Sequence, residues 1–263
     1  MIGNSADRVP EVVVALLTPF DSDGRPDLGA LEAHVDFLVS AGVDALMPCG
    51  TTGEGPLLSD AELGSVVRAT VGAARGRVRV LAHVGRLSTS DTVRGGRDAL
   101  EAGADAVSAV VPYYYHYRDA EVVAHFRALI EACAGGGVYA YTIPARTGNE
   151  LSVEAVRALA GAGLRGVKDS TKSFERFLEY MRCGVDVLTG TDAFVRDAFA
   201  AGAAGCVSAI ANVRPDLLCA VRDGRDVHDE IVQIRARLPF GRLKEAVAER
   251  IPGYPVGYRP PLP

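Results

Sequence analysis

The sequence predicts a (β/α)8 barrel, or TIM barrel, followed by a short C-terminal helical extension. Eight short runs rich in apolar and β-branched residues alternate with amphipathic stretches of helical spacing. The runs are apolar throughout, which indicates strands of a parallel sheet covered on both faces. Eight such units favour closure into a barrel, and an open doubly wound sheet is the alternative. We expect the barrel to span residues 1–223, and the helical segment with its proline-rich tail to span residues 224–263.

The predicted strands are identified by their apolar runs. In chain order they cover residues 12–17, 43–47, 78–83, 106–111, 138–141, 164–167, 185–188 and 205–210. Gly42, Gly103 and Gly202 each stand just before one of these runs. Glycine readily adopts the left-handed conformation that ends a helix, so these residues indicate helix stops ahead of short connections.

The predicted helices are identified by apolar spacing and by signals at their N-termini. Ser59 with Glu62 has the form of a capping box, and Ser152 with Glu154 opens a later helix. We expect helices over residues 28–40, from 59 onward, over 88–102 and 120–133, from 152 onward, and over 174–182, 193–201, 215–222, 227–237 and 242–250. The tail, PGYPVGYRPPLP, is too rich in proline for a helix and is expected to lie over the surface.

Composition limits the classes of partner. The formal net charge is −5, and no basic cluster is dense enough to bind a phosphate backbone, which argues against nucleic acid. The longest apolar run, residues 12–17, is too short to cross a bilayer, and the polar N-terminus lacks a signal-peptide core. The five cysteines form no Cys-x-x-Cys pair, as expected of free thiols in a reducing compartment. We therefore expect a cytoplasmic protein without a membrane or nucleic-acid partner.

The candidate site consists of the residues that follow the predicted strands, because the active site of a (β/α)8 barrel lies at the C-terminal ends of its strands. They are Gly50, Thr51 and Thr52 after the second strand, Tyr113, Tyr114 and Tyr115 after the fourth, Tyr141 and Arg146 at the fifth, Lys168 at the sixth, Gly190 at the seventh and Ile210 at the eighth. Hydroxyl groups, one lysine and one arginine therefore converge on one face of the barrel.

This set of residue types indicates keto-acid chemistry. Partial burial lowers the pKa of a lysine such as Lys168, and the neutral amine can attack a ketone to form an imine. Hydroxyls such as that of Tyr141 can move the protons that this chemistry requires, and an arginine such as Arg146 can bind a carboxylate with two donors. A lysine after a strand is more often a solvated loop residue. Lys168 differs because it directly follows the apolar strand and points over the barrel.

Other motifs have simpler interpretations. The glycine-rich turn after the second strand lacks the lysine of a phosphate-binding loop, and its spacing is not that of a dinucleotide motif. The histidines have no paired ligand spacing, which disfavours a metal-dependent aldolase, and only His83 faces the candidate site. Asp169 and Asp192 are interpreted as helix N-caps. The tyrosines within residues 113–117 could form an aromatic lid without a chemical role.

Three segments, in this order along the chain, resemble the dihydrodipicolinate synthase and N-acetylneuraminate lyase family. Residues 50–54 (GTTGE) are similar to its pyruvate-carboxylate loop. Residues 141–148 (YTIPARTG) are similar to its Tyr-Asn-x-Pro-x-x-x-Gly segment, and residues 166–169 (GVKD) resemble its Schiff-base segment. The resemblance runs over about residues 12–215 and includes the last strand.

The resemblance implies a role for each of these residues. Lys168 would form the imine with pyruvate, and Tyr141 would move protons at the reacting carbon. Thr51 and Thr52 would bind the pyruvate carboxylate through hydroxyl and backbone N–H groups. Tyr114 would enter the site of a neighbouring subunit to complete a Tyr–Thr–Tyr relay, which implies a homodimer or a homotetramer.

The resemblance also implies the nature of the ligands. Arg146 would help to hold the carboxylate of a second substrate, and Gly50, Gly190 and Ile210 complete the predicted substrate-binding set. The partners would be small keto-acids and aldehydes. No metal or other cofactor is expected, because the reactive group is the covalent imine on Lys168.

The leading functional hypothesis is the condensation of pyruvate with an aldehyde, as in dihydrodipicolinate synthase, whose acceptor is aspartate semialdehyde. The alternative is reversible cleavage of a 2-keto-3-deoxy sugar acid, to which the GEGPLLS run and the GYPVGYRPP ending are similar; a related dehydratase is a third. Thr142, Tyr115 and His116 depart from the synthase pattern and concern the second substrate. A non-catalytic keto-acid-binding paralogue is a remote alternative, against which the complete set of site residues argues.

Overall fold

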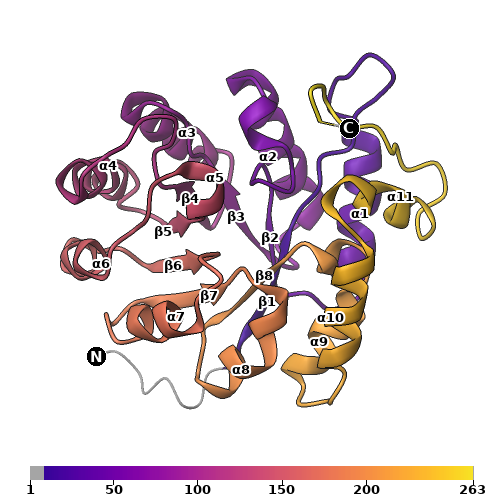
Figure 1. Cartoon of the computed structure of the whole chain (residues 1–263). Coiled ribbons are helices and arrows are strands. Elements are labelled where there is room, and N and C mark those ends of the chain that lie inside the picture. The colour runs from indigo at the N-terminus through magenta and orange to yellow at the C-terminus, as the bar shows by residue number, and fades with distance from the viewer. Residues whose placement is uncertain (1–8, 263) are drawn as a thin grey trace.

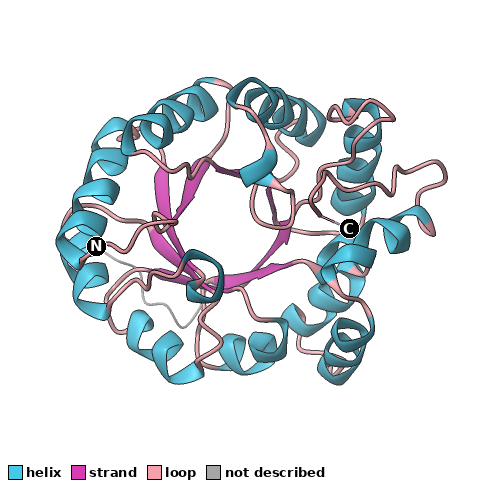
Figure 2. Ribbon diagram, turned by 45° about the horizontal axis from the view of Figure 1, so that its top comes forward, coloured by secondary structure: helices cyan, strands magenta, loops and turns pink. Residues whose placement is uncertain are grey.

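A computed structural model describes residues 9–262 and shows a closed barrel of parallel strands inside a ring of helices (Figures 1 and 2). The strands are β1 (Glu11–Ala15), β2 (Ala45–Met47), β3 (Arg79–His83), β4 (Ala106–Val110), β5 (Gly137–Thr142), β6 (Gly166–Asp169), β7 (Asp186–Thr189) and β8 (Gly205–Ser208). Each strand pairs in parallel with the next, and β8 pairs with β1. The predicted barrel is therefore confirmed, and the open sheet was the wrong alternative.

Helices occupy the connections between the strands. They are α1 (Leu28–Ser40), α2 (Asp60–Ala74), α3 (Thr89–Glu101), α4 (Asp119–Ala132), α5 (Pro144–Thr147), α6 (Val153–Ala160), α7 (Phe174–Met181), α8 (Val195–Ala200), α9 (Pro215–Arg222), α10 (His228–Arg237) and α11 (Leu243–Ala248). Short 3-10 turns are η2 (Gly55–Leu57), η3 (Asp192–Phe194), η4 (Ile210–Asn212) and η5 (Phe240–Arg242). In Figure 1 the C-terminal helices α9, α10 and α11 lie on the same side of the barrel as α1.

The capping box and the left-handed glycines predicted from the sequence are present in the structure. The Ser59 hydroxyl accepts a hydrogen bond from the backbone N–H of Glu62, and the Glu62 carboxylate accepts one from the N–H of Ser59, which completes the capping box of α2. Gly42 and Gly103 have φ values of 85° and 96°, in the left-handed region that favours glycine. These turns return the chain directly to β2 and β4.

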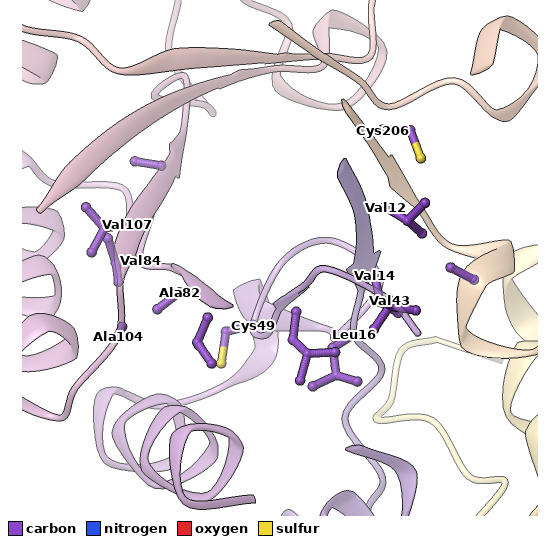
Figure 3. Close-up of a cluster of buried hydrophobic side chains, with 14 of the residues drawn as sticks. Val12, Val14, Leu16, Val43, Cys49, Ala82, Val84, Ala104, Val107 and Cys206 are labelled. Carbon is purple, nitrogen blue, oxygen red and sulfur yellow. The ribbon is translucent and has the colours of Figure 1, made fainter. Parts of the chain in front are cut away.

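The core has two layers. The outer layer lies between the sheet and the helices, and Figure 3 shows part of it around Val12, Val14, Ala82 and Val107. The inner layer fills the barrel with side chains of the strands and of Ala204, which directly precedes β8: Val13, Ala15, Ala45, Met47, Leu81, Ala106, Tyr139, Leu188, Ala204 and Val207. Because side chains alternate along a strand, the next inward positions above this layer belong to the mouth of the barrel.

Some expected boundaries were wrong in ways that matter for the site. Strand β6 extends to Asp169, so Lys168 is a strand residue and its inward direction is set by the sheet. The segment after β5, for which no element was predicted, forms the helical turn α5, which a proline at its first position favours. The helix expected over residues 193–201 is divided into η3 and α8.

Candidate active site

Lys168 occupies the inner face of the barrel near its mouth. Its side chain is buried, with 4% of the residue exposed, and its Nζ lies 3.7 Å from Sδ of Met47 on β2. The same Nζ lies 4.0 Å from the centroid of the Tyr141 ring. Burial lowers the pKa of Lys168 below its ordinary value, and interactions with Tyr141 and Asp192 partly oppose this shift. Burial therefore shifts the protonation equilibrium of Lys168 toward the neutral amine, which is the nucleophilic form.

Tyr141 reaches Lys168 because their strands pair in register. The two residues stand opposite each other on β5 and β6. The Tyr141 hydroxyl lies 3.4 Å from Oγ1 of Thr51, and either oxygen can donate. A lysine, a phenol and an alcohol from three different strand ends therefore form one contiguous set. This is the arrangement expected at a barrel mouth.

The turn that carries Thr51 folds back tightly on itself. The N–H of Glu54 donates to the carbonyl of Thr51 at 3.3 Å, and the N–H of Gly55 donates to the carbonyl of Gly50 at 3.0 Å. A Cβ on Gly55 would lie 1.8 Å from the Cys49 carbonyl oxygen, so only glycine fits there. Thr52 lies half-buried in the same turn. The turn thus holds both threonines and several backbone groups at the mouth.

Tyr114 does not enter the interior of its own barrel. It is 81% exposed, and its ring packs edge-on against Tyr115 with 5.0 Å between centroids. Its φ of 81° is unusual for a residue with a bulky side chain. A single chain therefore presents this phenol to its surroundings and does not bury it beside Lys168.

Arg146 is an exposed residue of α5, at the rim of the barrel. The buried Asn149 connects this segment to the tyrosine loop: its Nδ2 donates to the carbonyls of Pro112 at 2.9 Å and Tyr115 at 2.7 Å. Its Oδ1 accepts a hydrogen bond from the N–H of Tyr117 at 3.0 Å. Sequence reasoning missed Asn149, whose only local signal is a polar residue after a Gly148 turn.

The interpretation of Asp192 and Asp169 as N-caps was wrong. The carboxyl of Asp192 accepts a hydrogen bond of 2.6 Å from Oγ of Ser208, and Arg235 on α10 lies 3.6 Å from its second oxygen. Asp169 accepts a hydrogen bond from the N–H of Thr171, whereas α7 is capped by Ser173. Burial raises the pKa of both carboxyls, and Asp192 is placed to influence Lys168.

Gly190 and Ile210 lie at the ends of β7 and β8, as predicted. The N–H of Gly190 donates to the Asp169 carbonyl at 2.6 Å, and a Cβ at this position would lie 2.1 Å from Oγ of Ser170. Ile210 is fully buried at the start of η4. The backbone of Gly190 therefore lies next to the mouth, whereas the side chain of Ile210 packs in the outer core layer.

His83 faces the site as expected, at the inward end of β3. Its ring meets that of Tyr141 edge-on, with 6.0 Å between centroids, and its Nε2 is buried without a hydrogen-bond partner. Burial, with the nearby charge of Lys168, lowers the pKa of His83 to about 3. The imidazole is therefore neutral near pH 7, and its uncharged ring packs beside Tyr141.

Within residues 9–262, no group of three or more His, Cys, Asp or Glu side chains is arranged to hold a metal ion. In the same part of the chain, no helix combines the length and the apolar character needed to cross a bilayer. The five cysteines are free thiols, four of them buried.

The fold and the buried lysine define a (β/α)8 barrel with an amine group at the C-terminal ends of its strands. Residues 8–229 match the model of the dihydrodipicolinate synthetase family. The chain belongs to this family, and it is a class I pyruvate-dependent lyase. The family predicted from the sequence is thereby confirmed.

Individual relatives support the same family. The chain is 37% identical to 4-hydroxy-tetrahydrodipicolinate synthase of Anaeromyxobacter sp. over 92% of this chain and 87% of that protein. The crystal structure of YagE from E. coli K12, a member of the dihydrodipicolinic acid synthase family in complex with pyruvate, superposes with a TM-score of 0.90 at 27% identity, over 96% and 92% of the two chains. KD(P)GA from T. tenax superposes with a TM-score of 0.83 at 30% identity, over the same shares of each chain.

Proposed function

We propose that Lys168 forms an imine with pyruvate and that the enzyme condenses this pyruvate with aspartate semialdehyde, as a 4-hydroxy-tetrahydrodipicolinate synthase does. The observation that carries the proposal is the buried Nζ of Lys168 against Tyr141, whose hydroxyl adjoins Thr51. Curated relatives such as the Anaeromyxobacter protein carry the name of this synthase. The synthase is therefore our first choice within the lyase class.

The chemistry follows from the positions of the groups. The neutral amine of Lys168 adds to the ketone carbon of pyruvate, and loss of water leaves a protonated imine. Removal of a proton from the methyl carbon gives an enamine, which attacks the aldehyde carbon. Tyr141 lies against Lys168 and would accept and return these protons, with Thr51 as its hydrogen-bond partner. Hydrolysis of the product imine restores the lysine.

Binding of the two carboxylates is assigned to separate parts of the mouth. Thr51 and Thr52, with the backbone of Gly50, would hold the pyruvate carboxylate in the tight turn after β2. Arg146 would bind the carboxylate of the second substrate at the rim, and the backbone at Gly190 and Ile210 would line the part of the mouth that follows β7 and β8. No cofactor enters this scheme, because the imine itself withdraws the electrons.

Tyr114 supports a proposal about assembly. An exposed phenol on a left-handed residue is suited to insertion into a neighbouring subunit, where it could join the hydroxyls of Tyr141 and Thr52. We therefore propose a homodimer or homotetramer in which each site is completed by the other chain. The free thiols accord with a reducing compartment, so a cytoplasmic location belongs to the same proposal.

The second candidate is an aldolase acting on a 2-keto-3-deoxy sugar acid. The similarity to KD(P)GA from T. tenax, at 30% identity, favours it, and so do Tyr115 and His116 at the rim. Both candidates use the same imine and differ in the aldehyde. A panel of aldehydes offered with pyruvate would separate them: faster turnover of an uncharged sugar aldehyde than of aspartate semialdehyde would replace the first candidate by the second.

The imine is tested by intact mass after treatment with pyruvate and borohydride. We expect a single adduct of about 72 Da, the mass of a reduced pyruvate imine, on the parent protein and none on Lys168→Ala. Lys168→Ala should fold normally and lose all but a few per cent of turnover. No adduct on the folded parent in excess pyruvate would overturn the proposal and leave a keto-acid-binding protein or another chemistry.

A further inference from the structure

Glu54 is a fully buried charge at the base of the glycine-rich turn. Its carboxylate Oε1 lies 2.7 Å from Nζ of Lys244 on α11, and neither side chain has any exposed surface. Removing two charges from water costs free energy that their attraction must offset, so such a pair persists only where further hydrogen bonds complete it. The partners that complete this pair come from the C-terminal tail.

The tail saturates both members of the pair. Nζ of Lys244 also donates to the carbonyl of Gly257 at 2.7 Å and lies 4.4 Å from the ring centroids of Phe20 and Tyr258. The second oxygen of Glu54 accepts a hydrogen bond of 2.9 Å from the N–H of Arg259. The tail, which was expected to lie over the surface, therefore supplies buried partners to a turn about 200 residues away.

Arg259 then holds the other side of the same turn. Its Nη1 donates to the carbonyl of Leu57 at 2.8 Å, its Nε donates to the carbonyl of Gly24 at 3.0 Å, and its guanidinium pairs with Glu62 at the start of α2. Glu54 immediately precedes η2, and Leu57 is the last residue of η2. The tail thus binds both ends of this 3-10 turn.

The backbone of Glu54 connects the buried pair to the candidate active site. Glu54 has a φ of 57°, in the left-handed region that a non-glycine residue seldom adopts. Its N–H donates to the carbonyl of Thr51, whose Oγ1 meets the Tyr141 hydroxyl. A displacement of Glu54 therefore changes the turn that presents Thr51 and Thr52.

We propose that Lys244 and Arg259 are positioning residues that act through the turn from Glu54 to Leu57, so that the C-terminal tail sets the affinity of the Thr51–Thr52 turn for the pyruvate carboxylate. The inference rests on the proposed function, in which this turn binds pyruvate. It assigns to the tail a part in substrate binding that is separate from the chemistry at Lys168.

The test replaces the charged pair by neutral residues of similar size, Lys244→Met with Glu54→Gln, because this double variant leaves no unpaired buried charge. The pyruvate concentration that gives half-maximal borohydride trapping and the KM for pyruvate should both rise about tenfold or more. The kcat at saturating pyruvate should change by less than about threefold, and the KM for the second substrate should stay the same. A purely structural role would reduce the folded fraction, which lowers kcat per chain and leaves both constants unchanged.

Arg242→Gln is the matched control, because it breaks an exposed pair with Glu245 next to Lys244. It should leave pyruvate binding unchanged. Arg259→Met is a second test, because it removes the side-chain contacts to Leu57, Gly24 and Glu62 and keeps the Glu54–Lys244 pair. It should raise both the pyruvate concentration for half-maximal trapping and the KM for pyruvate. A folded double variant, or a folded Arg259→Met if the double variant does not fold, with the parent's pyruvate dependence would overturn the inference. Failure of the parent itself to trap pyruvate would instead overturn the proposed function.

Discussion

Lys168 and Tyr141 stand opposite each other on neighbouring strands, and the amine of the first lies 4.0 Å from the ring centroid of the second. The ring covers the amine, while the hydroxyl reaches on to Thr51. The aromatic face and the phenol oxygen can therefore have separate effects, the first on the burial of the amine and the second on proton transfer.

Tyr141→Phe separates these two effects. The ring remains, so Lys168 stays buried and pyruvate should still be trapped by borohydride. Without the hydroxyl, turnover should fall by roughly a hundredfold, the usual scale for a group that transfers protons. Steady-state kinetics and trapping on the same sample give both quantities. An unchanged turnover would show that another group moves the proton.

Tyr114 can be tested by complementation between subunits. Tyr114→Ala and Lys168→Ala should each be nearly inactive when expressed alone. If Tyr114 completes the site of a neighbouring chain, co-expression should restore activity, because a mixed pair contains one site with both groups; random dimers would recover about a quarter of the parent's sites. Mixed oligomers without recovered activity would place the function of Tyr114 in its own chain or remove it from the reaction.

Arg146→Ala should weaken binding of the second substrate. A charged hydrogen-bond pair contributes about 1.5–3 kcal/mol, so the KM for a carboxylate-bearing aldehyde should rise about tenfold to a hundredfold. The KM for pyruvate should not change. Arg127→Ala, at an exposed position of α4, is the control for loss of a surface charge. If the aldehyde KM of Arg146→Ala equals that of the parent, the acceptor is bound elsewhere or is not an acid.

Two glycine substitutions should have opposite effects. Gly55→Ala forces the Cβ against the Cys49 carbonyl, so the turn must shift, the free energy of unfolding should fall by roughly 1–3 kcal/mol and pyruvate binding should weaken. Gly72→Ala, at an open position of α2, should raise the free energy of unfolding by up to about 1 kcal/mol. Urea unfolding measures the free energy of unfolding of both variants, and borohydride trapping measures their binding of pyruvate. Equal stabilities would mean that the turn around Gly55 is looser than its contacts indicate.

His34 makes stability depend on pH. It is fully buried, its Nε2 lies 3.1 Å from the Asn212 carbonyl oxygen, and its Nδ1 lies 3.3 Å from the Tyr254 hydroxyl. Burial lowers its pKa to about 4 from an ordinary 6.5. Between these values the unfolded chain binds the proton and the folded chain does not. The neutral His34 therefore contributes fully to the free energy of unfolding above pH 6.5. As the pH falls from 6.5 toward 4, this contribution is lost, and the free energy of unfolding decreases by ~3 kcal/mol.

His34→Gln removes this titration. The variant should be less stable at pH 7, and its free energy of unfolding should decline less steeply between pH 6.5 and 4 than that of the parent. His116→Gln, at an exposed position, should retain the parent's slope. Urea titrations at four or five pH values give the slopes, and an equal slope for His34→Gln would assign the dependence to other groups.

Much of the site could be predicted from the sequence because a barrel brings the ends of all its strands together. Residues identified by local signals at separate strand ends are therefore expected to meet in space. Continuous apolar runs, helix caps and left-handed glycines identify the strand–helix units, and strand ends in a parallel barrel all open on one face. Lys168, Tyr141 and Thr51 could therefore be grouped although they lie up to 117 residues apart, as the spacing of their numbers shows. No local pattern, however, specified the register that places Lys168 against the Tyr141 ring.

Only the tertiary structure decided the partners of the buried polar groups. Asp192 was expected as a helix cap on local grounds, but its carboxyl is paired with Ser208 and Arg235 from elements later in the chain. Glu54 was expected only as part of a glycine-rich turn, yet its charge is completed by Lys244, 190 residues away. Backbone preferences act over a few residues and can be recognised in the sequence. The partner of a buried charge, in contrast, depends on which distant segments pack together in the folded chain.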